Sequence, residues 1–194
     1  MKFDVVIVGV GGQGVLLASE VLSEVALKEG YDVKKSEIHG MAQRGGSVFS
    51  FVRIGEKVFS PIIPMGSADI MLAFEELEAI RYVPYMKIGS NIVLNRQRIA
   101  PITVLSGDAS YPENTVEILS RDFKVHSIDG IGIAKRLGDP RVTNMVLLGY
   151  MARRFMPLGI DIWLDTIRER VPERHRDKNI EAFMMGWNHG EGEV

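Results

Sequence analysis

The feature that most constrains the fold is a glycine-rich turn close to the start of the chain. Residues 3–9 form a short run rich in β-branched side chains, and the hexapeptide GVGGQG at 9–14 completes a G-x-G-x-x-G pattern. From residue 13 to 29 the apolar positions recur every three or four residues, as on one face of an amphipathic helix. A strand, a glycine turn and a helix in this order are typical of an α/β fold that binds a phosphate at the helix N-terminus. The predicted cofactor-binding residues of the turn are Gly9, Gly11, Gly12, Gln13 and Gly14.

The rest of the chain alternates strands and helices up to residue 128 and is helical beyond it. Strands are predicted at 31–38, 47–54, 69–74, 91–94 and 124–128, with a helix at 75–85. A hairpin turn at 55–57 is predicted to lead into a short strand at 58–59. Later helices are predicted after Asp129, at 145–155, at 161–171 and around 180–187. We therefore expect an α/β fold in which residues 1–194 form a single domain: a Rossmann-like open, mostly parallel sheet with an antiparallel hairpin and a helical C-terminal part.

Composition and charge narrow the classes of function. The 194 residues include no cysteine, which excludes disulfides, thiolate nucleophiles and cysteine-ligated iron–sulfur clusters on this chain. With 23 Lys and Arg against 25 Asp and Glu, the chain lacks the basic field that nucleic-acid binding needs. The apolar run at the N-terminus is too short to span a membrane and has no signal-peptide pattern, so a cytoplasmic protein is expected. No metal site is predicted, because no second ligand stands at the right spacing from His39.

A pair of lysines in the second predicted strand argues against an ordinary NAD site. Such a site has an acidic residue near the end of that strand to receive the ribose hydroxyls. Here Lys34 and Lys35 occupy the middle of the strand, between Asp32 and Glu37. They suit a ligand with an extra phosphate on its ribose, such as NADP or coenzyme A. In the alternative interpretation, one lysine is solvated and the other pairs with Glu37, and the glycine turn binds nothing.

The segment after the second strand is rich in hydrogen-bond donors. It lies where open α/β sheets bind ligands, and a guanidinium beside two glycines can bind a carboxylate or a phosphate. Turns in a mobile surface loop would explain the same glycines. The candidate interface or substrate-side residues of this segment are His39, Gln43, Arg44, Gly45 and Gly46.

Taken together, these motifs resemble the gamma-type subunit of the 2-oxoacid:ferredoxin oxidoreductases, in particular the indolepyruvate branch. The resemblance covers most of the chain: it rests on residues 9–14, on 37–48 (EIHGMAQRGGSV), on NMVLLG at 144–149, and on KNIEAF at 178–183 with Gly186. Fused relatives in this family carry a Tyr-Asp-x-Lys-Lys-Ser segment, which YDVKKS at 31–36 repeats.

The resemblance implies an activity and a division of labour. The family's reaction is the oxidative decarboxylation of a 2-oxoacid, with the acyl group passed to coenzyme A and electrons to ferredoxin. In the indolepyruvate branch the substrates are aryl pyruvates from the breakdown of aromatic amino acids, and the products are aryl-acetyl-CoA. A larger alpha subunit is expected to carry thiamine diphosphate and 4Fe-4S clusters. This chain is expected to hold no cofactor tightly, to be inactive alone, and to supply the coenzyme A side, with Lys34 and Lys35 near the phosphates.

Two asparagines in the family motifs and two rival functions remain open at this point. Asn144 is expected to cap the helix that starts near it, and Asn179 to bond a neighbouring loop or another subunit. The main rival is a stand-alone NADP-binding oxidoreductase or a dinucleotide-sensing regulator. A purely structural assembly subunit is the third possibility. No catalytic residue is identified from the sequence.

Overall fold

The central element of the fold is one mixed β-sheet. The computed structural model describes residues 2–39 and 45–189. Within these residues the strands form a six-stranded sheet of order β2-β3-β1-β4-β5-β6. Strands β1, β4, β5 and β6 run parallel, whereas β3 is antiparallel to both β1 and β2. The mostly parallel α/β sheet with an antiparallel pair is thus confirmed. The strands are β1 Phe3–Val10, β2 Asp32–His39, β3 Ser47–Gly55, β4 Ala68–Ala73, β5 Met86–Asn95 and β6 Lys124–Ile128.

The antiparallel strand β3 lies inside the sheet, between β1 and β2. The predicted strand at 58–59 is wrong, because these residues form no strand and the side chain of Phe59 is 86% exposed. The physical reason is that β3 already pairs on both edges, so no free edge remains for a strand that follows it.

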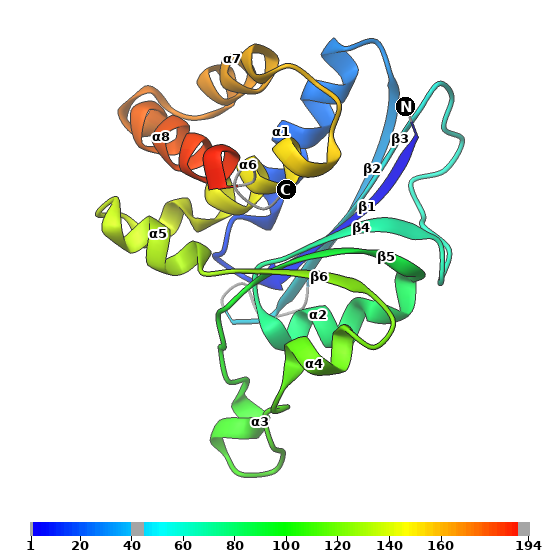
Figure 1. The fold of residues 1–194 in the computed structure, drawn as a ribbon, viewed down its shortest axis with the longest axis vertical. Helices are drawn as coiled ribbons and strands as arrows, with labels where there is room; N and C mark the ends of the chain where they lie inside the picture. The colour runs from blue at the N-terminus through cyan, green and yellow to red at the C-terminus, as the bar shows by residue number, and fades with distance from the viewer. Residues whose placement is uncertain (1, 40–44, 190–194) are drawn as a thin grey trace.

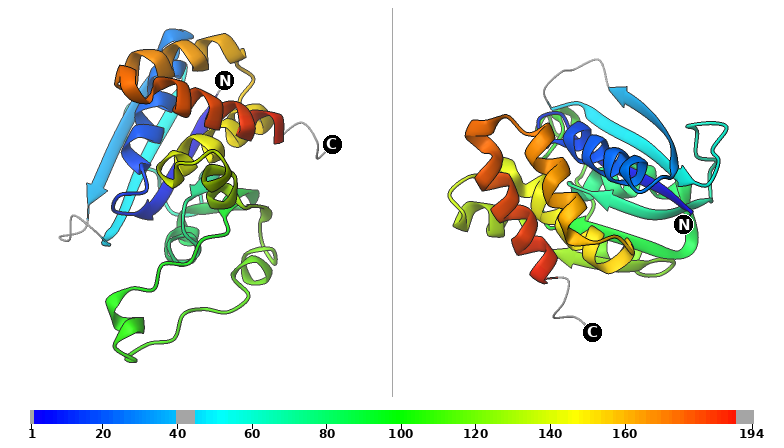
Figure 2. Two further views of the ribbon diagram at one scale, coloured as in Figure 1. Left: turned by 90° about the vertical axis from the view of Figure 1, so that its left-hand side faces the viewer. Right: turned by 90° about the horizontal axis from the view of Figure 1, so that it is seen from above.

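Helices cover both faces of the sheet (Figures 1 and 2). One face is covered by α1 and α6, on which α7 and α8 pack as an outer layer, and the other face is covered by α2 and α4. The helical C-terminal part is therefore confirmed, and it packs on the face that also carries α1. The helices are α1 Val15–Lys28, α2 Glu76–Tyr82, α3 Ile102–Leu105, α4 Thr115–Leu119, α5 Gly130–Arg136, α6 Thr143–Phe155, α7 Ile160–Arg170 and α8 Glu173–His189; short 3-10 helices span Val83–Tyr85 and Pro140–Val142.

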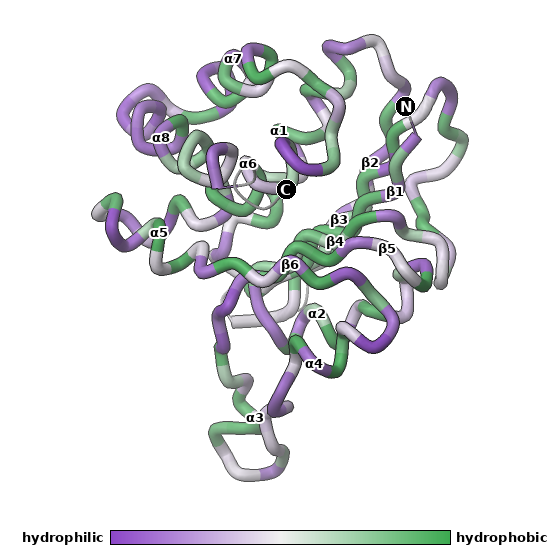
Figure 3. The backbone as a smooth tube through the Cα atoms, viewed as in Figure 1, coloured by the Kyte–Doolittle hydropathy of each residue, from purple (hydrophilic) through white to green (hydrophobic). Residues whose placement is uncertain are grey.

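Strand β1 runs through the middle of the core. Val5 and Ile7 pack with the helices of the first face, while Val6 and Val8 pack against the second, and all four are fully buried. Figure 3 shows the same pattern as a hydrophobic band along the central strands. Because successive strand residues point to opposite faces, a continuous apolar run is what a strand covered on both sides requires. The glycine turn that follows β1 is therefore held at the centre of the carboxyl edge.

Helices α6 and α8 cross at unusually close range. A Cβ atom added to Gly149 would overlap the carbonyl oxygen of Phe183, and one added to Gly186 would overlap that of Val146. Glycine at both positions lets the two backbones touch. The contact fixes the start of α6 relative to α8, and both helices contribute residues to the glycine turn's surroundings.

Residues 96–114 form an excursion between β5 and α4 that extends away from the sheet and carries α3 (Figure 1). Its base is held by the buried carboxylate of Glu75. That group accepts hydrogen bonds from the amide of Ile99, at 2.9 Å, and from the hydroxyl of Tyr111. Both ends of the excursion are thereby tied to the start of α2. In the described part of the chain, no helix is long and apolar enough to cross a membrane.

Candidate functional site

The glycine turn lies at the switch point of the sheet. After β1 the chain moves to one side to form β2 and β3, and then returns past β1 to form β4 on the other side. Open α/β sheets bind ligands in the crevice at the carboxyl ends of the two strands where the direction reverses. The turn at 9–14 begins in the last two residues of β1 and Phe74 follows β4, so both lie at that crevice.

Two glycines of the turn adopt a backbone conformation that other residues avoid. Gly12 has φ of +100° and Gly14 has φ of +82°. A Cβ atom at Gly14 would lie 2.8 Å from Cγ of Asn144, whereas nothing lies within 4 Å of the corresponding position at Gly12. Gly9 is closed off, with the Cβ of Phe74 3.2 Å from the position of an added Cβ. Gly12 is therefore the open side of the turn.

The main-chain amides of the turn divide into paired and free ones. The amide of Gly11 donates to the carbonyl of Gly46 at 2.8 Å, and that of Gln13 donates to Val10 at 3.0 Å. The amides of Gly12 and Gly14 donate to no acceptor among residues 2–39 and 45–189. They precede α1, whose N-terminus adds free amides and the positive end of the helix dipole. This arrangement is chemically suited to a phosphate or another anion.

The side chain of Gln13 braces the turn. Its Oε1 accepts from the amide of Val10 at 2.7 Å, and its Nε2 donates to the carbonyl of Phe74 and to Oε1 of Gln97, both at 3.1 Å. Asn95 donates to the same two acceptors from β5, each at 3.0 Å. This amide cluster joins the carboxyl ends of β1, β4 and β5. Contact of Gln13 with a cofactor stays a prediction.

Two small cavities adjoin the turn on either side of Gly12. One has a volume of about 200 Å³ and includes Phe74, Gln97 and Arg141 in its lining. The other, of about 220 Å³, is lined by Gly14, Asn144, His175 and other residues from α6 and α8. Gly12 and Arg141 line both. The open side of the turn and the side chain of Arg141 therefore border both cavities.

Sequence reasoning missed Arg141. Its side chain is 76% exposed and forms two hydrogen bonds with the carboxylate of Asp139, Nε to Oδ1 at 2.9 Å and Nη2 to Oδ2 at 2.8 Å. The guanidinium hydrogen bonds hold the pKa of Asp139 down, at about 2. Of the described residues lining the two cavities, Arg141 is the one lysine or arginine. A single Asp-Pro-Arg before a helix carries no signal that distinguishes it from an ordinary turn.

Asn144 does not cap its helix, so that prediction is wrong. The N-cap of α6 is Val142, because the side chain of Asp139 caps the preceding 3-10 turn and Thr143 already belongs to the helix. Asn144 lies instead against the glycine turn, with Nδ2 3.4 Å from the carbonyl oxygen of Gly14. Its Oδ1 is buried and accepts no hydrogen bond from the described residues. The side chain of Asn144 therefore lines the second cavity with one buried acceptor that is unpartnered among the described residues.

Asn179 and the segment after β2 were also singled out from the sequence. The Nδ2 of Asn179 donates to the carbonyl of His175 within α8, at 2.8 Å, and the residue lines the second cavity. The carbonyl of Gly46 accepts a hydrogen bond from the amide of Gly11 in the glycine turn. Gly45, the residue before Gly46, has φ of +79°. The backbone of His39 pairs with Val48 at the end of β2. The side chain of His39 lies outside the described residues, as do Gln43 and Arg44 altogether.

The two lysines are not brought to the turn. Lys34 pairs with Asp32 at 2.8 Å and Lys35 with Glu37 at 2.6 Å, on opposite faces of β2. Lys35 pairs across the sheet with Val52, which pairs with Val5, four residues before Gly9. At about 3.3 Å per strand residue, the lysine backbone stands roughly 13 Å back from the turn along the strands. Lys35 thus forms the ion pair with Glu37 that the alternative interpretation proposed. Binding of one phosphate by Lys34 and Lys35 together stays a prediction.

A buried carboxylate supports the start of β3 beside the turn. Glu78 in α2 accepts from the hydroxyl of Ser47 at 2.5 Å and pairs with Arg81 at 2.6 Å. Burial raises the pKa of Glu78 above its ordinary value, and the Ser47 hydrogen bond and the Arg81 charge partly oppose that shift. No group of three or more His, Asp or Glu side chains able to hold a metal occurs in the described residues.

Comparison with known proteins places the chain in a family. The family model described as pyruvate ferredoxin/flavodoxin oxidoreductase matches residues 4–189. The chain is 40% identical over 190 residues to the indolepyruvate oxidoreductase subunit IorB of Thermococcus kodakarensis, covering 95% of this chain and 94% of that one. IorB of Archaeoglobus fulgidus is 40% identical over 193 residues, with 97% and 95% covered. The pyruvate synthase subunit PorC of Methanothermobacter thermautotrophicus is 29% identical over 182 residues, with 92% and 91% covered.

Solved structures show the same fold. The gamma subunit of a keto/oxoacid ferredoxin oxidoreductase from Geobacter sulfurreducens superposes with a TM-score of 0.72 at 24% identity, covering 97% of this chain and 98% of that one. A 2-oxoglutarate:ferredoxin oxidoreductase from Magnetococcus marinus gives a TM-score of 0.77 at 18% identity, covering 100% of this chain but 32% of that one. With the family match and the relatives at 40% identity, the chain belongs to the pyruvate ferredoxin/flavodoxin oxidoreductase family and is a subunit of an oxoacid:ferredoxin oxidoreductase.

Proposed function

We propose that this chain is a subunit of a thiamine diphosphate-dependent indolepyruvate:ferredoxin oxidoreductase and forms the coenzyme A side of its active site. The complex would oxidatively decarboxylate aryl pyruvates, transfer the acyl group to coenzyme A as aryl-acetyl-CoA, and reduce ferredoxin. The observation that carries the choice of substrate is the 40% identity to relatives named for indolepyruvate, against 29% to a pyruvate synthase subunit. The same likeness disfavours a stand-alone NADP-binding oxidoreductase.

The glycine turn supports the assignment to coenzyme A. The free amides of Gly12 and Gly14, at the N-terminus of α1, would bind a phosphate of this ligand. Arg141 borders the same region and can exchange its bond with Asp139 for one with a phosphate. The buried Oδ1 of Asn144 would accept a hydrogen bond from a ribose hydroxyl or an amide of the ligand. Lys34 and Lys35 are left out of this proposal, since the strand register separates them from the turn.

The size of the cavities supports a shared site. Each has about 200 Å³ or slightly more, whereas pockets that enclose a whole small ligand have about 300–1,000 Å³. This chain would therefore enclose one part of coenzyme A and leave the remainder against another subunit. Gln43 and Arg44 stay predicted residues of that interface.

The partner in this proposal is the one that the family resemblance implies, a larger alpha subunit that would hold the 4Fe-4S clusters and the thiamine diphosphate. The lack of cysteine agrees with this, because the chain cannot ligate such a cluster through thiolates. In this proposal residues 1–194 act as one gamma-type domain of a cytoplasmic hetero-oligomer, inactive alone, and ferredoxin binds the assembled complex.

The test is an activity assay on the native complex, purified through an affinity tag on this chain. Ferredoxin reduction is measured with indolepyruvate, pyruvate or 2-oxoglutarate, each with and without coenzyme A. We expect kcat/KM for indolepyruvate to exceed that for the other two oxoacids at least about tenfold, a difference of roughly 1.4 kcal/mol in transition-state stabilisation, with turnover dependent on coenzyme A. Equal or faster turnover of pyruvate, or full activity of the larger subunit alone, would refute the proposal.

A further inference from the structure

A second concave region lies at the other end of the sheet. Three adjoining cavities, of about 650, 550 and 430 Å³, surround the amino end of β1, and Lys2 lines all of them. Lys57 lines the first, and Lys87 lines the second and third. We call this hollow around Lys2, Lys57 and Lys87 the lysine groove. Because β1 has eight residues, the groove is roughly 23 Å from the glycine turn at about 3.3 Å per residue.

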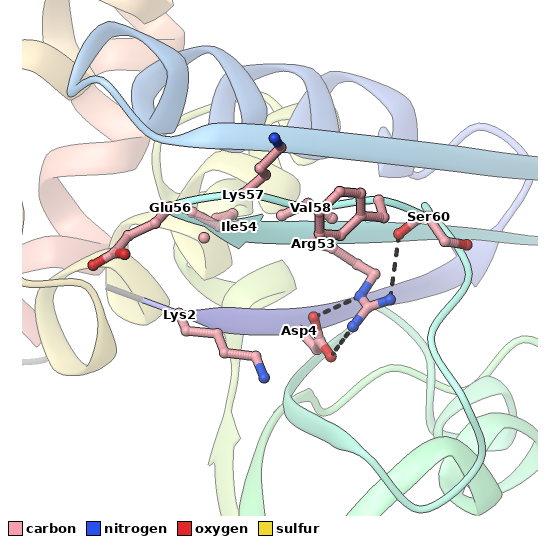
Figure 4. Close-up of a pocket in the computed structure, with 10 residues that line it drawn as sticks. Lys2, Asp4, Arg53, Ile54, Glu56, Lys57, Val58 and Ser60 are labelled. Atoms are coloured by element: carbon pink, nitrogen blue, oxygen red, sulfur yellow. Dashed lines mark hydrogen bonds and ion pairs between the residues drawn. The ribbon is translucent and has the colours of Figure 1, made fainter.

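One wall of the groove is a loop that is pinned to the sheet (Figure 4). The guanidinium of Arg53 pairs with Asp4, Nε to Oδ1 at 2.8 Å and Nη2 to Oδ2 at 3.1 Å. Its Nη1 also donates to the carbonyls of Ser60, at 3.3 Å, and Ile62, at 3.0 Å. The loop 56–62 is thereby held in place without a strand of its own. A binding surface that is already ordered loses less conformational entropy when a partner docks.

Large apolar side chains stand exposed around the groove. Phe59 is 86% exposed on the pinned loop, Met65 is 72% exposed three residues beyond it, and Ile88 is 78% exposed near the start of β5. Single exposed apolar residues need no explanation, but Phe59 and Ile88 each line one of the adjoining cavities. Exposed aromatic, Met and Ile side chains that flank a hollow are typical of a protein contact surface.

The charge of the groove selects the kind of partner. Arg53 is neutralised by Asp4, whereas Lys2, Lys57 and Lys87 form no ion pair with any described residue. Besides Asp4, two acids line the hollow, Glu56 and Asp69, and the carboxylate of Asp69 accepts a hydrogen bond from the amide of Asp4 at 3.0 Å. With Arg53 and Asp4 cancelling, the three lysines and these two acids leave a formal charge of +1. A second copy of this chain would bring like charges together, and an acidic partner would be attracted.

We propose that the lysine groove docks an acidic segment of the partner subunit, with apolar side chains of that segment packing against Phe59 and Ile88. The identity of the partner rests on the proposed function. A polypeptide segment fits a hollow, whereas a flat lipid surface would need the basic and apolar side chains to protrude from a convex face. The chain is then attached to the complex at the amino end of its sheet and binds coenzyme A at the carboxyl end.

The test measures association with the larger subunit of the complex by surface plasmon resonance. The charge variant is Lys57→Glu with Lys87→Glu, and the apolar variant is Phe59→Ser. We expect the charge variant to associate about tenfold more slowly than the wild type and to lose most of the salt dependence between about 50 and 500 mM. Phe59→Ser should dissociate at least about tenfold faster. Matched controls at exposed positions outside the groove are the double reversal Lys135→Glu with Arg136→Glu and the single substitution Leu27→Ser. They should change neither rate by more than about twofold, and circular dichroism confirms that each variant folds.

Each contrary outcome has a distinct meaning. Unchanged rates for both groove variants, in a complex that still oxidises indolepyruvate, would overturn the docking site and leave the proposed function intact. Control variants that change the association or dissociation rate as much as the groove variants do would also overturn the docking site. Binding of the wild type, but not the charge variant, to phosphatidylserine vesicles while subunit association stays unchanged would assign the groove to a membrane. A wild-type chain that does not bind the larger subunit would overturn the proposed function together with the docking site.

Discussion

The contact between the glycine turn and α6 can be tested by adding one methyl group at each of two glycines. Gly12→Ala and Gly14→Ala both place a side chain on a left-handed backbone, with φ of +100° and +82°. At Gly12 the new Cβ meets no atom within 4 Å, whereas at Gly14 it would lie 2.8 Å from Cγ of Asn144. The two substitutions therefore share the backbone strain and differ in the packing overlap.

The expected magnitudes follow from these two terms. A left-handed alanine costs about 1–2 kcal/mol, which is the whole effect expected for Gly12→Ala. Overpacking a buried contact adds about 1–3 kcal/mol, so Gly14→Ala should lower the free energy of unfolding by roughly 2–5 kcal/mol. Asn144→Ala removes the overlapping Cγ and Nδ2 and leaves only Cβ, 3.2 Å from the added methyl carbon, so most of the overlap cost of Gly14→Ala should disappear in that background.

The assay is urea unfolding followed by circular dichroism and by the fluorescence of Trp163 and Trp187, whose agreement tests for a two-state transition. The free energy of unfolding is compared at equal m-values, so that compactness is held constant. The reasoning is refuted if Gly14→Ala costs no more than Gly12→Ala. It is equally refuted if the cost of Gly14→Ala is the same with and without the Asn144 side chain.

Two further predictions concern the packing of α6 on α8 and the buried acid beneath β3. Gly186→Ala would push a Cβ into the carbonyl of Val146, a backbone atom that cannot rotate away, so we expect a loss of about 3 kcal/mol or more in urea unfolding. Gly159→Ala is its control, because Gly159 has φ of −63° and open space around its Cβ position, and a shift beyond about 1 kcal/mol there would contradict the reasoning. Since burial raises the pKa of Glu78 above 4.5, the folded state binds that proton more tightly than the unfolded chain does. The wild type should therefore gain stability relative to Glu78→Gln as the pH falls from 7 towards 4.5 in urea titrations, and a relative loss would be the contrary result.

Features encoded locally were predictable from the sequence. The strand–turn–helix at residues 3–28 follows from a β-branched run, glycines that tolerate positive φ, and a helical period. The start of α5 was equally predictable from Asp129, whose side chain accepts a hydrogen bond from the amide of Gly132, as the side chain of an N-cap residue does. The opposite orientation of Lys34 and Lys35 also follows from the two-residue period of a strand, and it argues against one shared phosphate cradle.

Features that depend on distant parts of the chain were not predictable. The insertion of β3 between β1 and β2 is a choice of pairing partner that no short window of sequence contains. Asn144 has the local preference of a helix cap, but its side chain contacts Gly14, 130 residues earlier in the chain. Arg141 reaches the glycine turn only because α6 packs on the same face of the sheet as α1. In each case a tertiary contact overrides the local conformational preference.

The most direct test of the coenzyme A site is calorimetric titration of the assembled complex with coenzyme A. The decisive variant is Arg141→Ala, which removes the guanidinium beside Gly12. Its control is Arg168→Ala, which removes a comparable exposed pair with Asp165 on α7, 2.6 Å apart, outside the lining of either cavity. A charge-assisted hydrogen bond is worth about 1.5–3 kcal/mol, so Arg141→Ala should raise Kd about tenfold or more while Arg168→Ala leaves it unchanged. An unchanged Kd in Arg141→Ala would contradict the assignment of coenzyme A to the glycine turn.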